Sequence, residues 1–189
     1  LARQYDATTT SAGSTLSSFD ALQGGETLTM TGSGVAASKN VANGIAMSSN
    51  GTLALANGTG LASNYSLNST AINISKRVLN SSGSKTYDAN TNALASAITL
   101  SNFASTETLN KSGTASTSSA NAGSYTISNL SGITIADGTN GGLASNYTLT
   151  GGTHNFTVNR RVVGVSGTRL YDATTNAVAS DLATHANLV

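Results

Sequence analysis

A tripeptide, Tyr-Asp-Ala, occurs three times in the chain and constrains its fold more than any other feature. The copies begin at Tyr5, Tyr87 and Tyr171, so they are 82 and 84 residues apart. A hexapeptide, Gly-Leu-Ala-Ser-Asn-Tyr, keeps the same register and ends at Tyr65 and Tyr147. Two motifs that recur at one period indicate a tandem repeat, in which each unit is one structural module.

The joints between the repeats are short. Ile74–Val78 corresponds to Val158–Val162, and neither segment is a flexible linker rich in Pro, Gly or Ser. Such joints favour units that are stacked end to end. The sequence predicts repeat 1 at residues 1–75, repeat 2 at residues 76–159, and the start of a truncated third repeat at residues 160–189.

The composition excludes several classes of partner. Charged residues make up 9% of the 189 residues and the net charge is +1, so no basic patch for nucleic acid is expected. No apolar run is long enough for direct membrane insertion. Cys is absent, which excludes disulfides and thiolate metal ligands. The expected partners are neighbouring repeats of the same chain, with carbohydrate or a surface protein as the alternative.

Apolar residues alternate with polar ones, which is typical of half-buried strands. In repeat 1, Tyr65 and Leu67 share one face of a predicted strand, and Ile72 and Ile74 share one face of the next. The same pattern in repeat 2 falls on Tyr147, Leu149, Phe156 and Val158. Each pair of segments predicts an antiparallel hairpin, and two extra residues at 151–152 are assigned to the turn of the second hairpin.

Further strands are predicted from the same alternation. They are Leu16–Phe19, Glu26–Met30, Ile45–Ser48 and Thr52–Leu55 in repeat 1, and Ala97–Ser101, Glu107–Asn110, Ser124–Leu130 and Gly132–Ala136 in repeat 2. Helix is disfavoured because Ser, Thr, Asn and Gly are poor in helix interiors. We therefore predict an all-β fold of tandem, small, antiparallel β-sandwich-like repeat domains. Units of a β-grasp-like kind, with one short helix, are the alternative.

The repeated motifs are interpreted as structural anchors. These anchors are Tyr5, Asp6, Asn64, Tyr65, Tyr87, Asp88, Asn146, Tyr147, Tyr171 and Asp172. Each Tyr is expected to cap the core with its ring, and each Asn to hold a loop. A cation, Arg3, Lys85 or Arg169, stands two residues before the Tyr and is expected to lie along the phenol ring. The Asp is expected to point the other way and to accept backbone N–H bonds in an Asx-type turn.

In these motifs the chain resembles the YDG-type repeats of large bacterial surface adhesins, which are filamentous-haemagglutinin-like proteins exported by two-partner secretion. The matching features are the Lys/Arg-x-Tyr-Asp opening, a central strand at Gly123–Ile127, the Asn-Tyr-x-Leu segment and a final apolar strand. The usual third residue of the family's Tyr-Asp motif is Gly, whereas this chain has Ala7, Ala89 and Ala173. Repeat 1 also departs from the pattern, with Gly44–Met47 in place of the Tyr-containing strand.

No catalytic motif is present, and no enzymatic activity is expected. The two histidines, His154 and His185, occupy unmatched positions of the repeat, and His154 is expected to be an exposed strand residue. The turn at Asp137–Asn140 offers oxygen atoms to calcium, but the corresponding Asn57–Gly60 lacks the carboxylate. A plain turn without a cofactor is therefore favoured, with calcium as the alternative. A Lys–Asn isopeptide crosslink at Lys85 is disfavoured, because Arg replaces it in the other copies.

The resemblance implies a cell-surface stalk that is built of many such modules. We expect a structural spacer segment of a secreted, extracellular bacterial cell-surface adhesin, which projects a distal binding domain. The alternative is that the repeats themselves bind carbohydrate or a host or matrix protein. That alternative needs an exposed aromatic cluster, whereas aromatic residues are 5% of the chain and most are assigned to the core.

Overall fold

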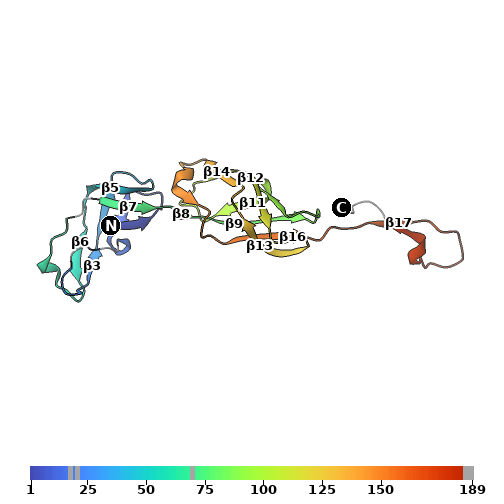
Figure 1. Ribbon diagram of the computed structural model, residues 1–189, viewed down its shortest axis with the longest axis horizontal. Helices are drawn as coiled ribbons and strands as arrows, with labels where there is room; N and C mark the ends of the chain where they lie inside the picture. The colour runs from blue at the N-terminus through green and yellow to red at the C-terminus, as the bar shows by residue number, and fades with distance from the viewer. Residues whose placement is uncertain (17–18, 20–21, 69–70, 185–189) are drawn as a thin grey trace. The chain divides into compact units, whose positions relative to one another are not determined.

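The structure is a computed structural model that describes residues 1–16, 19, 22–68 and 71–184 (Figure 1). In these residues the regular elements are eighteen strands and five 3-10 turns of three residues each. The prediction of an all-β fold is confirmed. β-Grasp-like units need a helix longer than these turns, and the described residues contain none. No described helix is long and apolar enough to cross a membrane.

The elements follow the chain in order. Repeat 1 contains β1 (Ala2–Gln4), β2 (Thr10–Ala12), η1 (Gly13–Thr15), β3 (Leu28–Thr31), β4 (Ser33–Ala36), β5 (Ala42–Ser49), β6 (Ala54–Asn57), η2 (Ala62–Asn64) and β7 (Ala71–Ser75). Repeat 2 contains β8 (Arg77–Val78), β9 (Asn80–Thr86), β10 (Asn92–Leu94), η3 (Ala95–Ala97), β11 (Ile98–Ser101), β12 (Leu109–Thr117), β13 (Gly123–Asn129), β14 (Ile133–Asp137), η4 (Ala144–Asn146), β15 (Tyr147–Thr148) and β16 (His154–Asn159). The start of the third repeat contains β17 (Val165–Gly167), η5 (Ala179–Asp181) and β18 (Leu182–Thr184).

The two repeats build the same sheet from equivalent strands. In repeat 1 the strand order is β1-β7-β5-β4-β2. In repeat 2 the strands β9-β16-β13-β12-β10 follow one another in the same way, and β11 is added beside β9. A smaller pairing, β3 with β6, corresponds to that of β14 with β12. The shared topology explains why the two sequence motifs keep a fixed register.

The first strand of each repeat runs parallel to the last. Arg3 of β1 lies opposite Ile74 of β7, and Lys85 of β9 lies opposite Val158 of β16. The other edge of the last strand pairs antiparallel with β5 in repeat 1 and with β13 in repeat 2. The sheets are therefore mixed, whereas the sequence predicted purely antiparallel units.

The two predicted hairpins are wrong. Tyr65 follows η2 outside any strand, and β15, which begins at Tyr147, pairs in parallel with β8. Ile72 and Phe156 lie on β7 and β16, and both edges of each of these strands are taken by other segments. Alternation detects a strand but does not identify its partner. The connection from β15 to β16 does hold the two extra residues, and Gly151 there has a φ of +85°.

Most of the other predicted strands are present. β5, β11, β13 and β14 cover the predicted segments almost completely, whereas β3, β6 and β12 begin two residues later than predicted. Neither Leu16 nor Phe19 lies in a strand. The two residues between them lie outside the described residues, as does His185.

The chain divides into two compact units that differ from the predicted repeats. The first unit comprises residues 1–80, 100–111 and 135–152, and the second comprises residues 81–99, 112–134 and 153–189. Three segments of repeat 2, residues 76–80, 100–111 and 135–152, therefore fold into the same compact unit as repeat 1. The boundaries of the repeats remain a prediction from the sequence.

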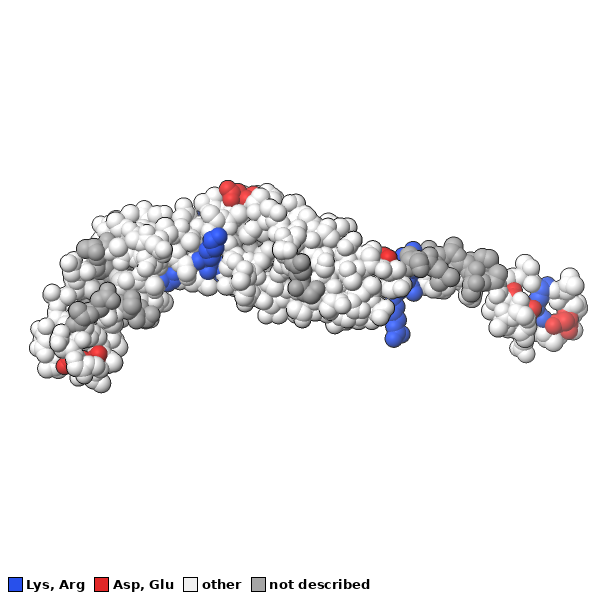
Figure 2. All heavy atoms as spheres, in the orientation of Figure 1, with Lys and Arg blue, Asp and Glu red and all other residues white. Residues whose placement is uncertain are grey.

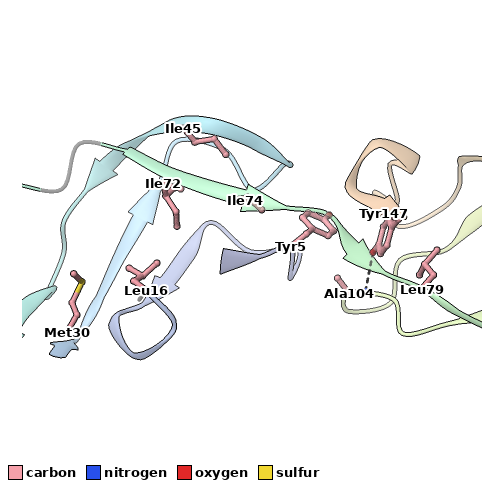
Figure 3. Packing of buried hydrophobic residues seen from close by; sticks show 10 residues of the cluster. Tyr5, Leu16, Met30, Ile45, Ile72, Ile74, Leu79, Ala104 and Tyr147 are labelled. Carbon is pink, nitrogen blue, oxygen red and sulfur yellow. Dashed lines mark hydrogen bonds between the residues drawn. The ribbon is translucent and has the colours of Figure 1, made fainter. Parts of the chain in front are cut away.

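One hydrophobic core extends through the first compact unit (Figure 3). Repeat 1 contributes Tyr5, Leu16, Met30, Ala36, Ile45, Ile72 and Ile74, and repeat 2 contributes Leu79, Ala104 and Tyr147. Full burial of a large apolar side chain contributes about 2 kcal/mol, so this shared core binds the segments of repeat 2 firmly to repeat 1.

The second compact unit has a core of its own. It is formed by Ala93, Ala95, Ile98, Ala115, Ile127, Ile133, Phe156 and Val158. Gly83 lies so close to the Phe156 ring that an added Cβ would be 2.8 Å from Phe156 Cε2. At the start of the third repeat, by contrast, Leu170 and Tyr171 are 92% and 93% exposed. Figure 2 shows that charged atoms are sparse on the face displayed.

Candidate functional site: the joint between repeats

The cation and the aspartate of the Tyr-Asp-Ala motif form a local clasp. Arg3 pairs with Asp6 and donates a hydrogen bond of 2.5 Å to the Thr8 carbonyl. Asp6 Oδ1 accepts the Thr8 N–H at 2.9 Å, which is the Asx-type turn that the sequence predicts. The prediction that the Asp points away from the cation is wrong, because the turn brings the carboxylate back to the guanidinium.

The other two copies make the same clasp. Lys85 Nζ lies 2.7 Å from Asp88 Oδ1 and donates a bond of 2.7 Å to the Asn90 carbonyl. Arg169 pairs with Asp172, and Asp172 Oδ1 accepts a backbone N–H two residues further on at 2.9 Å. The clasp therefore forms from local sequence alone, even where the Tyr beside it is exposed.

The alanine of each motif has a left-handed backbone. Its φ is +67° at Ala7, +60° at Ala89 and +62° at Ala173. This conformation costs an alanine about 1 kcal/mol, because its Cβ crowds the next carbonyl oxygen. The clasp holds the chain in the geometry that a glycine adopts without this cost.

Tyr5 extends from its clasp into a joint with repeat 2. Its side chain is 0% exposed, and its ring packs edge-on against Tyr147 with 5.5 Å between centroids. Phe103 packs on Tyr147 in the same manner at 5.7 Å, and each such pair contributes about 1 kcal/mol. Figure 3 shows the two Tyr rings close together, with Leu79 and Ala104 beside Tyr147.

Glu107 accepts hydrogen bonds from both phenols. Tyr5 donates to Oε1 and Tyr147 donates to Oε2, each at 2.7 Å. Lys39 Nζ of repeat 1 lies 3.2 Å from Oε1. The Glu107 side chain is buried, and a buried carboxylate is stable only with partners of this kind. The Tyr147 hydroxyl also accepts the Ala104 N–H at 3.1 Å.

The joint shifts the acidity of its three central groups. Burial and then the hydrogen bond to Glu107 raise the pKa of Tyr147 to about 12, and the same two causes raise the pKa of Tyr5. Burial acts to raise the pKa of Glu107, but hydrogen bonds from Tyr147, Tyr5 and Lys39 outweigh it and place that pKa below its ordinary value. At neutral pH the joint therefore contains a carboxylate that is bound by two neutral phenols.

Asn146 holds a loop of the preceding repeat. Its Oδ1 accepts the Val41 N–H at 2.9 Å, and its Nδ2 donates to Asn40 Oδ1 at 3.0 Å. The side chain is 0% exposed, so both bonds are shielded from water. The Asn of the hexapeptide thus holds a loop, and that loop belongs to repeat 1.

Arg77 connects the same two repeats through their backbones. It donates to the Tyr5 carbonyl at 3.4 Å, to the Asn102 carbonyl at 2.7 Å and to Asn102 Oδ1 at 2.9 Å. Asn102 has a φ of +69° and donates to the Val78 carbonyl at 2.8 Å. All residues of these contacts lie in the first compact unit. We call them together the joint: Tyr5, Lys39, Asn40, Val41, Arg77, Val78, Leu79, Asn102, Phe103, Ala104, Glu107, Asn146 and Tyr147.

Repeat 1 contains the counterparts of Glu107, Asn146 and Tyr147. These are Glu26, Asn64 and Tyr65, and they are less buried than in repeat 2. Tyr65 donates to Glu26 Oε2 at 2.5 Å, as Tyr147 does to Glu107. Tyr65 and Glu26 are half-buried, and Asn64 is exposed. Because the hexapeptide is identical in the two repeats, its deep burial in repeat 2 comes from the preceding repeat. We call Glu26, Asn64 and Tyr65 the acceptor face of repeat 1.

A pocket of about 570 Å³ includes one residue of this acceptor face. Its lining combines the carboxylate of Glu26 with the apolar side chains of Leu16, Phe19, Leu28 and Met30. Such a hollow is able to receive an apolar ring that carries one polar group.

The prediction for His154 is wrong. Its side chain is 7% exposed, and Nδ1 lies 3.0 Å from the hydroxyl of Ser81, which is itself buried. The reason is that β16 lies between β9 and β13, so a residue at its beginning is enclosed on both sides.

The turn that was considered for calcium has a structural role. Asp137 Oδ1 accepts the Ala144 N–H at 2.7 Å, and in repeat 1 Asn57 Oδ1 accepts the Ala62 N–H at 2.8 Å. The same bond forms with and without a carboxylate, so its charge is not needed there. Within the described residues, no group of three or more His, Cys, Asp and Glu is placed to hold a metal ion.

Reasoning from the sequence identified some residues of the joint and missed others. Tyr5, Asn146 and Tyr147 were recognised as anchors, whereas Glu107 and Lys39 were not. The one available signal was the pair Glu26 and Glu107, which stand 81 residues apart, one residue out of register with the motifs. Lys39 has no counterpart in repeat 2 and left no signal.

These contacts define a class of protein: a tandem β-repeat chain whose repeats are joined through Tyr, Glu and Asn side chains. The model of the YDG domain matches residues 1–72 and again residues 75–155. The chain therefore belongs to the YDG domain family. Searches of curated proteins and of solved structures found no match to it.

Proposed function

We propose that this chain is a structural spacer segment, in which YDG repeats are joined firmly enough to hold a distal binding domain away from a bacterial cell surface. The observation that carries the proposal is the buried joint. Glu107, Asn146 and Tyr147 of repeat 2 are at most 4% exposed where residues of repeat 1 meet them. A flexible linker would leave such polar groups in water.

The surface location, secretion by a two-partner system and membership of an adhesin rest on the sequence resemblance. Labelling of intact bacterial cells with an antibody to this segment, before and after permeabilisation, tests the location. Labelling of intact cells is the expected result, and labelling only after permeabilisation contradicts the proposal.

Amide hydrogen exchange tests whether the joint is firm. The Val41 N–H bonds to Asn146, and the Ala104 N–H bonds to Tyr147. We expect both to exchange as slowly as amides of β7, because they open only when the joint opens. Exchange at the rate of a free loop would mean that the repeats move independently, and the spacer proposal would then fail.

A second candidate function is binding of carbohydrate or a host protein by the repeats themselves. The pocket beside Glu26 favours it, since Phe19 offers an aromatic ring and Glu26 a hydrogen-bond acceptor. A glycan array and a panel of matrix proteins, probed with the chain and with Phe19→Ala, test it. Binding that Phe19→Ala abolishes would establish this function in place of a pure spacer.

A further inference from the structure

We infer that repeat 2 is a mechanical clamp: it bears tension along the chain through the parallel ladder between β9 and β16, which such tension loads in shear. Lys76 connects the repeat to repeat 1, and Arg160 connects it to the start of the third repeat. Tension on the chain therefore enters the repeat ahead of β9 and leaves it after β16. The inference goes beyond the spacer proposal and requires neither secretion nor a cell surface.

The ladder between β9 and β16 is continuous. It runs in register from Ser81 opposite His154 to Thr86 opposite Asn159. Just outside these limits, the Ser81 N–H donates to the Thr153 carbonyl and the Tyr87 N–H donates to the Asn159 carbonyl, each at 2.9 Å. Because the strands are parallel, the beginning of β9 and the end of β16 lie at opposite ends of the ladder. These are the two ends on which tension acts.

The parallel orientation decides how the hydrogen bonds are loaded. They run from strand to strand, whereas the tension here acts along the strands. All pairs of the ladder therefore carry the load together and have to give way together. If the two strands were antiparallel, the loaded ends would lie side by side and the bonds would open one pair at a time. A shear arrangement therefore needs a higher force to break.

Side chains reinforce the ladder from within. At the end where tension enters, the directly opposed side chains of Ser81 and His154 are buried, and Ser81 Oγ lies 3.0 Å from His154 Nδ1. Further along β16, Phe156 and Val158 are each 1% exposed. They keep water away from one side of the ladder, where it would compete for the hydrogen bonds.

The far edge and the exit of β16 are held as well. Residues Gly123–Thr126 of β13 pair antiparallel with Asn155–Val158, so β16 is bound on both edges. Beyond the ladder, Arg161 donates to the Tyr87 carbonyl at 3.4 Å. Tension therefore acts on a strand that is anchored in the sheet, and it is directed onto the contact with β9.

Repeat 1 has the same orientation of its first and last strands. Ala2–Gln4 of β1 run parallel to Asn73–Ser75 of β7. The Tyr5 N–H donates to the Ser75 carbonyl at 3.0 Å, and the Tyr5 carbonyl accepts from Arg77 at 3.4 Å, as the Tyr87 carbonyl accepts from Arg161. The arrangement is therefore a property of the repeat, and successive repeats of one chain would bear tension in series.

The test pulls the whole chain by two introduced cysteines in a single-molecule force experiment. The chain has no Cys of its own, so each pair of attachment points is unambiguous. Lys76→Cys with Arg160→Cys loads β9 and β16 in shear, as tension along the chain does. Thr86→Cys with Arg160→Cys is the matched control, because it pulls the adjacent ends of the same two strands apart. All three positions are exposed.

We expect the shear pair to break at a several-fold higher force than the control at the same pulling rate. Breakage releases the segment between residues 76 and 160, whose unfolded length is roughly 300 Å. Ser81→Ala lowers the force for the shear pair, because the contact with His154 is loaded there from the start. It leaves the force for the control unchanged, since there the same contact is the last to open.

Two results overturn the inference. Equal forces for the two attachment pairs would show that the direction of the load is immaterial, so the ladder would not be the element that bears it. A high force with a shorter release, while β9 and β16 stay paired, would place the resistance elsewhere in the repeat. Urea unfolding of every variant verifies that it is folded. Neither result bears on the joint, which hydrogen exchange at Val41 and Ala104 reports separately.

Discussion

The same hexapeptide occupies two very different environments in this protein. In repeat 2, Asn146 and Tyr147 are 0% and 1% exposed, and they bind repeat 1. In repeat 1, Asn64 is exposed and Tyr65 is half-buried beside Glu26. Identical sequence with different burial shows that the deep burial of the motif in repeat 2 depends on its contacts with repeat 1. Its role is to receive the repeat that precedes it.

The largest expected difference in stability between the two repeats comes from removing the carboxylate of Glu107 or of Glu26. We expect Glu107→Ala to lower the free energy of unfolding by about 4 kcal/mol, because two buried phenols and Lys39 lose their acceptor. The matched variant Glu26→Ala removes a half-buried group with one partner and is expected to cost less than half as much. Urea unfolding of both variants measures the difference, and equal losses would contradict the account.

Alkaline pH is expected to open the joint. Burial and the bond to Glu107 raise the pKa of Tyr147 from 10.0 to about 12, so the folded state holds this proton more tightly than the unfolded state. The resulting stability is complete below pH 10 and is lost as the pH rises through the folded-state value. At about 1.4 kcal/mol per pKa unit, the loss attributable to Tyr147 is about 3 kcal/mol.

Absorbance of tyrosinate, followed from pH 9 to pH 13, measures this shift. Of the six tyrosines, Tyr5 and Tyr147 are expected to ionise last. Urea unfolding of Tyr147→Phe at each pH serves as the control, because this variant lacks the alkaline loss from that phenol. Ionisation of all six near pH 10 would show that no phenol is sequestered.

The two asparagines give the cleanest comparison, since they lie in the same hexapeptide. Asn146→Ala removes two shielded hydrogen bonds and leaves the Val41 N–H without its acceptor, which is expected to cost about 2 kcal/mol. Asn64→Ala alters an exposed side chain and is expected to change stability by less than about 0.5 kcal/mol. Thermal unfolding of the pair provides the measurement. A substantial loss in Asn64→Ala would mean that Asn holds its own repeat.

The smallest effect concerns a feature that the repeats share. Ala89→Gly is expected to stabilise the chain by about 1 kcal/mol, because glycine adopts its φ of +60° without steric cost. Ala46→Gly, at an exposed position in β5, is the control and is expected to destabilise by about 0.5 kcal/mol. A loss of stability in both variants would show that the alanine at the clasp is not strained.

The repeat, the all-β class and most strands were predictable, because period and alternation are properties of local sequence. The clasp was half predictable: an Asx-type turn follows from Asp6, but not its pairing with Arg3. Strand partners were not predictable, since β7 pairs with β1 across some 70 residues and nothing in its alternation indicates this.

The joint shows the same limit. A buried Tyr was expected at Tyr147 from its residue type, but its partner Glu107 resembles any other acidic residue in the sequence. Contacts of this kind depend on which segments the sheet topology brings together. His154 illustrates the converse, because a polar residue near a strand end became buried when two strands enclosed it.

A double-mutant cycle between Tyr5 and Glu107 tests the central claim most directly. Tyr5→Phe, Glu107→Gln and the double variant are compared by urea unfolding, with Tyr5→Phe and Glu26→Gln as the control cycle. The account predicts a coupling energy of about 1.5 kcal/mol in the first cycle and additivity in the second. Additivity in the first cycle, to within about 0.5 kcal/mol, would contradict the claim that Glu107 of repeat 2 binds Tyr5 of repeat 1.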